Sequence, residues 1–136
     1  MASLKTFCEE HNVNPENALE FVVGQGGDIL PQKTGFQGYF AELTETSLIF
    51  TNDVLKVQKE VPFTSFQRAE FGIGSGQLWL QCVVDGSPFV FCMRRKHWKS
   101  EGAKRMLAKI GEQTEILDMK EYNGYTGKLF FIYMWK

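Results

Sequence analysis

Apolar and polar residues alternate in short runs through the middle of the chain, and turn-forming residues separate the runs. Tyr39, Ala41 and Leu43, for example, are spaced two apart before a turn at Thr44-Glu45-Thr46. This period of two is typical of antiparallel strands. The dipeptide Asp85-Gly86 between two apolar runs is the strongest hairpin signal in the chain. We predict strands over residues 39–43, 47–51, 55–60, 66–71, 78–84 and 89–93.

Two short helices are predicted before the strands. The first has one apolar stripe at helical spacing, made of Leu4, Phe7, Cys8 and His11. Asn14-Pro15 is typical of a helix start and Gly24 of a helix end, so a second helix is predicted between them. Its apolar face consists of Ala18, Leu19, Val22 and Val23.

A third helix is predicted after the strands, from about Lys96 to Ile110, with Gly111 ending it. Its apolar stripe consists of Trp98, Gly102, Ala103, Met106, Leu107 and Ile110. The remaining residues, 112–136, contain a short possible strand over Glu115–Asp118 and an aromatic strand over Lys128–Trp135. We see no repeat or linker that would divide the chain, so residues 1–136 are predicted to form one domain.

The cysteines predict a reducing compartment. Three cysteines cannot all pair within one chain, and Cys82 and Cys92 flank the Asp85-Gly86 turn. If those two residues form the turn, Cys82 faces Phe89 and Cys92 faces Trp79, which puts the two thiols on opposite faces of the sheet. We therefore expect free thiols and a cytoplasmic protein.

Charge and hydropathy argue against nucleic-acid binding and against a membrane-spanning helix. The net charge is −1, so nucleic acid is not the expected partner, because phosphate binding needs a basic excess. The N-terminus lacks the apolar run of a signal peptide, and the longest apolar run, Leu129–Trp135, is too short to cross a bilayer as a helix. We expect a soluble protein.

The order of about six antiparallel strands and one amphipathic helix, from about Gly27 to Gly111, resembles the bacterial pleckstrin-homology (PH) and GRAM-like modules. Gly38–Thr51 looks like their first hairpin, in which a threonine is followed after three residues by Leu48-Ile49-Phe50. Val61-Pro62-Phe63 and the helix around Trp98 lie where those modules place a strand entry and the closing helix. The resemblance implies a mainly β, α+β fold: a bent sheet or partial barrel closed by the helix, with N-terminal helices over residues 1–26 and a C-terminal strand extension over residues 112–136.

Many eukaryotic members of the family that the chain resembles bind phosphoinositides, many others bind proteins instead, and the bacterial ones often form oligomers. The family's headgroup site uses lysine and arginine around the first hairpin loop. In this sequence that loop is read as Thr44-Glu45-Thr46-Ser47, which carries an acid and no base. We therefore expect no phosphoinositide recognition there.

No constellation of catalytic or metal-binding residues stands out, so we expect no enzyme, no metal and no cofactor. Only His11 and His97 could serve as a catalytic base. Cys8 and His11 share a helical stripe, but they supply at most half of a tetrahedral zinc site. Gly72-Ile73-Gly74-Ser75-Gly76 lacks the residues of a phosphate loop and is predicted to be a flexible connection.

Two segments are candidate contact sites for a non-catalytic binding module. The aromatic terminus is apolar on both faces and needs cover, either within the chain or from another subunit; its contact residues are Phe131, Tyr133 and Trp135. The preferred partner is a protein, including a second copy of the chain. The alternative is an anionic membrane surface, bound by the basic cluster Arg94, Arg95, Lys96, Trp98 and Lys99. A barrel that binds a small ligand is the second alternative.

Overall fold

The computed structural model describes residues 3–25, 29–30, 37–74, 77–93 and 100–118. Its strands are β1 (Ala18–Gln25), β2 (Gln37–Leu43), β3 (Ser47–Asn52), β4 (Val57–Pro62), β5 (Phe66–Gly74), β6 (Gln77–Val84), β7 (Ser87–Met93) and β8 (Ile116–Asp118). Its helices are α1 (Leu4–His11), α3 (Glu101–Gln113) and the 3-10 turns η1 (Pro15–Asn17) and η2 (Phe63–Ser65). The predicted mainly β, α+β class is confirmed. Within the described ranges, no helix is long and apolar enough to cross a membrane.

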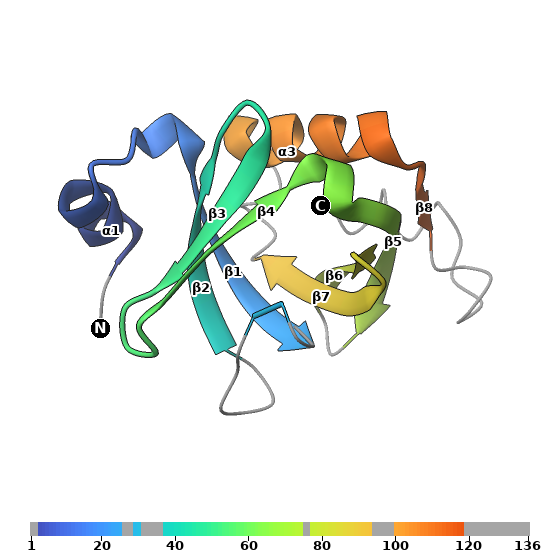
Figure 1. Ribbon diagram of the computed structural model, residues 1–136, viewed down its shortest axis with the longest axis horizontal. Helices are drawn as coiled ribbons and strands as arrows, with labels where there is room; N and C mark the ends of the chain where they lie inside the picture. Colours follow the sequence, from blue (N-terminus) through green and yellow to red (C-terminus); the bar gives the residue numbers. More distant parts are fainter. Residues whose placement is uncertain (1–2, 26–28, 31–36, 75–76, 94–99, 119–136) are drawn as a thin grey trace.

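The eight strands form one sheet in the order β4-β3-β2-β1-β7-β6-β5-β8. All neighbouring pairs are antiparallel except β5 and β8, which are parallel. Among the described strands, β4 and β8 each have one neighbour, so the sheet that they end is open. Figure 1 shows α3 lying across one end of the sheet.

The sheet bends around a single core. In a flat sheet, β3 and β7 would lie three strand spacings apart, or about 14 Å. The ring centroids of Phe50 on β3 and Phe89 on β7 are nevertheless only 5.5 Å apart, and both side chains are fully buried. The inner faces of the two halves of the sheet therefore pack on each other. Residues of β1 to β7, η2 and α3 all belong to this one buried cluster.

The second N-terminal helix predicted from Asn14-Pro15 is wrong, because the chain forms β1 there. The start signal itself is real: the Asn14 side chain accepts a hydrogen bond from the Glu16 backbone N–H at 3.0 Å. The helix stops after the single 3-10 turn η1, and the chain continues as a strand paired with β2 on one side and β7 on the other. The side chains that enter the core alternate along β1: Leu19, Phe21 and Val23.

The first predicted helix is confirmed as α1, which packs on the outer face of the sheet. Phe7 and Cys8 are buried in a small second cluster with Val13 and Ala18. The Phe7 ring stacks on Phe40 of β2 at 5.0 Å between centroids. Phe40 faces away from the main core because its neighbours along β2 are buried there. The contact therefore joins α1 to the opposite side of the sheet from α3.

The predicted closing helix is confirmed in its second part as α3, whose buried face consists of Gly102, Ala103, Met106 and Ile110. Ser100 caps it by accepting a hydrogen bond from the Ala103 N–H at 3.1 Å. The expectation that Gly111 ends the helix is wrong: α3 continues to Gln113 and ends at an extended Thr114. The predicted beginning of the helix, including Trp98, lies outside the described residues.

The Asp85-Gly86 hairpin forms as predicted. Both turn residues have positive φ, 49° and 80°, as a tight two-residue hairpin turn requires. The predicted register is confirmed, with Cys82 opposite Phe89 and Cys92 opposite Trp79. The cysteines at positions 8, 82 and 92 are free thiols. Of the two predicted C-terminal strands, the first is confirmed as β8, and residues 128–135 lie outside the described part of the chain.

Candidate binding surface

The predicted contact residues do not lie in the described part of the structure. The basic cluster Arg94, Arg95, Lys96, Trp98 and Lys99 falls in the gap between β7 and α3. The aromatic residues Phe131, Tyr133 and Trp135 follow the end of β8 at Asp118. Both sets therefore remain predictions. The surface considered next is formed by described residues of β5, β6 and β7.

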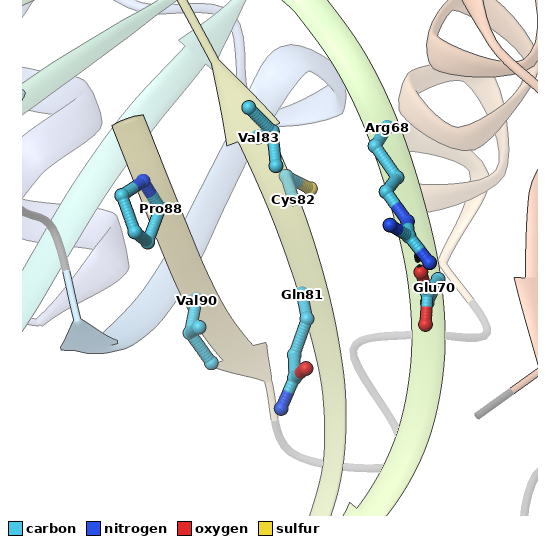
Figure 2. Close-up of a pocket in the computed structure, with 7 residues that line it drawn as sticks. All are labelled: Arg68, Glu70, Gln81, Cys82, Val83, Pro88 and Val90. Atoms are coloured by element: carbon cyan, nitrogen blue, oxygen red, sulfur yellow. Dashed lines mark hydrogen bonds and ion pairs between the residues drawn. The ribbon is translucent and has the colours of Figure 1, made fainter. Parts of the chain in front are cut away.

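The outer surface of β5, β6 and β7 carries a shallow hollow of about 240 Å³ (Figure 2). Strand alternation explains most of its composition: Ala69, Leu80 and Phe89 are buried in the core, so the residues next to them along each strand face outward, whereas Cys82 belongs to the core cluster. The register places Glu70 opposite Gln81 on the neighbouring strand. The lining residues are Arg68, Glu70, Gln81, Cys82, Val83, Pro88 and Val90.

The hollow combines an apolar side with a charged side. Val83, Pro88 and Val90 supply the apolar side from β6 and β7. On β5, the Arg68 guanidinium forms an ion pair with Glu70, which is only 5% exposed although it faces outward. A buried carboxylate is stable when it is paired in this way. The half-exposed Arg68 side chain and its Glu70 partner form a charged, ion-paired rim beside the apolar patch.

The size of the hollow favours one kind of occupant. Pockets that enclose small molecules generally have volumes of about 300–1,000 Å³ and bury most of the ligand. A smaller, open depression of about 240 Å³ with an apolar side and a charged rim fits a side chain presented by another polypeptide. The arrangement therefore suits protein contact better than small-ligand storage.

The structure corrects the position of the first hairpin. Because residues 18–25 form β1, the hairpin over Gly38–Thr51 is the second one in the sheet, formed by β2 and β3. The first hairpin loop lies between Gln25 and Gln37, and most of it is outside the described residues. The argument against headgroup binding drawn from Glu45 therefore applies to the wrong loop.

The loop between β2 and β3 instead holds the closing helix. The Lys109 ammonium of α3 donates to the Glu45 backbone carbonyl at 2.9 Å and lies 3.6 Å from a Glu45 carboxylate oxygen. One turn earlier on α3, Arg105 donates to the Glu16 carbonyl at 2.7 Å. Two cations thus tie α3 to carbonyl groups at the same end of the sheet.

His11 does not combine with Cys8 as a half-site. Cys8 is buried beside Phe7, whereas the His11 imidazole contacts the Asp53 carboxylate, with Nε2 lying 3.1 and 3.2 Å from its two oxygens.

The glycine-rich segment also differs from its prediction in part. β5 continues through Gly72 to Gly74, which pairs with Gln77, so only a very short connection separates β5 from β6.

The thiols should be inert in the folded protein. Burial raises the pKa of Cys82 far above its usual value of 9.0 and raises the pKa of Cys92 to about 11. Thiolate is the reactive form, so a chromogenic disulfide reagent at neutral pH should label neither thiol until the chain unfolds. Because both pKa values are raised, the neutral thiols favour folding below about pH 9, and for Cys92 this contribution disappears as pH rises from 9.0 to about 11.

Mass spectrometry of the labelled protein, with and without denaturant, tests this expectation. Rapid native labelling of Cys82 at neutral pH would contradict the burial on which it rests. A denatured control sample should react at all three cysteines. Their raised pKa values also make Cys82 and Cys92 poor nucleophiles.

Sequence reasoning did not identify the hollow. Its residues come from three strands. The signal that could have found them is the set of outward-facing positions along β5, β6 and β7, which include the polar residues Arg68 and Gln81 and the apolar Val90. The contact between His11 and Asp53 has no local signal, since the two residues are 42 positions apart.

A comparison of the chain with protein-family models found no match, and a comparison with curated proteins found none either.

Proposed function

We propose that the chain is a non-catalytic, PH-like binding module that recognises a protein, in the first instance a second copy of itself. The strand order β4-β3-β2-β1-β7-β6-β5, followed by α3 across one end of the bent sheet, supports the PH-like interpretation. The burial of all three thiols supports a binding role over catalysis by a cysteine nucleophile.

The hollow on β5, β6 and β7 is the observation that carries the proposal. It offers an apolar contact area next to a half-exposed guanidinium, which is the combination found where protein partners meet. β8 pairs with the outer edge of β5, so the described part of the chain ends at Asp118 next to β5. The aromatic contact residues proposed for this module, Phe131, Tyr133 and Trp135, follow later in the sequence.

Self-association through the aromatic terminus can be tested by measuring the solution mass. We expect light scattering after gel filtration to give a discrete oligomer for the unaltered protein. Changing Phe131, Tyr133 and Trp135 together to serine should convert it to a folded monomer, because large aromatics supply most of the apolar contact area. Val54→Ser is the control, since Val54 is 86% exposed on the turn between β3 and β4 and should leave the mass unchanged.

A second variant tests the surface itself. Val90→Arg places a charge on the apolar side of the hollow and should also yield a monomer, with circular dichroism confirming that the sheet is retained. A monomeric unaltered protein would contradict the proposal. The alternative would then be examined with anionic vesicles, whose binding by the cluster from Arg94 to Lys99 should weaken as salt is added.

A further inference from the structure

The last turn of α1 and the turn between β3 and β4 bring three metal-ligand side chains together. One donor atom from each of Glu10, His11 and Asp53 lies within 4.8 Å of the other two. The turn that carries Asp53 is held by its neighbour, because the Asn52 side chain accepts a hydrogen bond from the Leu55 N–H at 2.9 Å and donates to the Gly38 carbonyl at 2.7 Å. The cluster thus joins a helix on the outer face to a fixed turn of the sheet.

Among the described residues, the one ion pair at this cluster is that of His11 with Asp53. Within the described part of the chain, no lysine or arginine forms an ion pair with Glu10 or Asp53. The carboxylates of Glu10 and Asp53 bring two negative charges close together. The C-terminal end of α1, whose last residue is His11, adds the negative end of a helix dipole. The local field therefore favours a cation.

The donor atoms indicate which cation. Carboxylates alone would suit calcium or magnesium, whereas an imidazole nitrogen together with carboxylate oxygens suits zinc and related transition metals. Zinc binds such atoms at about 2.0–2.2 Å, so two ligands on a tetrahedral ion lie about 3.3–3.5 Å apart. The 3.1 and 3.2 Å separations between His11 Nε2 and the Asp53 oxygens are within a few tenths of an ångström of that spacing.

We propose that Glu10, His11 and Asp53 bind one divalent transition-metal cation, for which zinc is the natural probe. His11 supplies Nε2, the two carboxylates supply one oxygen each, and water completes the coordination. The ion fastens α1 to the turn between β3 and β4, and it adds to the small apolar cluster around Phe7 that otherwise holds the helix. This inference does not depend on the function proposed above.

Calorimetric titration of the reduced full-length chain with zinc chloride tests the site. We expect saturable uptake of one ion per chain and a rise in the melting temperature with zinc, because an ion that binds only the folded state stabilises it. Asp53→Asn and His11→Gln should each weaken binding about tenfold or more, by analogy with the cost of losing even a supporting group at a metal site. Glu9→Gln is the matched control, since Glu9 is the adjacent exposed acid on α1 but lies outside the cluster.

Cobalt(II) distinguishes this site from the other metal ligands in the chain. Cobalt held by one imidazole and two carboxylates should show only weak visible bands, whereas a cysteine ligand would add an intense thiolate charge-transfer band. A thiolate band, binding that survives Asp53→Asn, or the absence of saturable uptake at millimolar zinc would each overturn the proposal. Loss of binding in Glu10→Gln but not in Glu9→Gln would support it.

Discussion

Replacing Phe50 with alanine is expected to lower the free energy of unfolding by about 3–5 kcal/mol, the usual cost of removing a core phenylalanine. Phe50 is fully buried at the point where the two halves of the sheet meet. Its ring centroid lies 5.7 Å from that of Phe21, 6.5 Å from that of Tyr39 and 5.5 Å from that of Phe89. The cavity left by alanine would therefore open between β1, β2, β3 and β7, which cannot all move inward together.

Urea denaturation followed by circular dichroism measures this change. Phe40→Ala is the matched control, because Phe40 lies on the outer face and is only half-buried beside Phe7. It should cost less than half as much as the change at Phe50. Equal costs would contradict the conclusion that the bent sheet encloses one core centred on these aromatic rings.

Replacing Gly102 with valine is expected to destabilise the protein by about 1–3 kcal/mol, the usual penalty for overpacking a close contact. A Cβ at this position would lie 3.1 Å from the Glu16 backbone oxygen and 3.3 Å from Leu19 Cδ2. The Glu16 carbonyl cannot move away easily, because it also accepts the hydrogen bond from Arg105. The bulkier side chain should therefore push the first turn of α3 away from η1 and β1.

Gly111 provides a control on the same helix with the opposite sign. A Cβ there would meet no atom within 4 Å. Because alanine is the better helix former, Gly111→Ala should stabilise the protein by about 1 kcal/mol. Thermal unfolding of both variants measures the difference. A stable Gly102→Val protein would show that α3 does not need its close approach to the sheet.

Local signals predicted much of the fold. The Asp85-Gly86 turn determined both the hairpin and its register, because a two-residue turn leaves only one way to pair the strands. The stripe Gly102, Met106 and Ile110 identified the buried face of α3 for a similar reason. These residues are spaced one helical turn apart, so the pattern depends only on residues close in sequence. Where an element is determined by contacts between residues close in sequence, the sequence pattern was sufficient to predict it.

The error at β1 shows where local reading fails. Ala18, Leu19, Val22 and Val23 fit a helical face, and Leu19, Phe21 and Val23 fit a strand equally well. The segment forms a strand because it pairs on both sides, with β2 and with β7. The second of these partners is far along the chain, so a local pattern cannot reveal it. Misassigning this one segment also displaced the first hairpin, and with it the argument about headgroup binding.

The candidate surfaces were less predictable than the fold for the same reason. The hollow needs three strands in register, and the metal-ligand cluster needs Asp53 to meet the end of α1. The sequence identified His11 as a possible metal ligand and paired it with Cys8. In the structure, Cys8 is buried in an apolar cluster instead. Sequence spacing identifies donors, whereas only the fold selects their partners.

The position of β1 in the middle of the sheet has a consequence for how the chain folds. The hairpins β1–β2, β2–β3 and β3–β4 join residues close in sequence, and so do β5–β6 and β6–β7. Among the described strands, the pairing of β1 with β7 is the one that connects these two groups of hairpins, and it joins residues as distant as Val22 and Cys92. That step carries the largest loop-closure entropy, so it should set the folding rate. During synthesis, the free edge of β1 must wait for the ribosome to release β7, and in that interval it is the strand most exposed to mispairing.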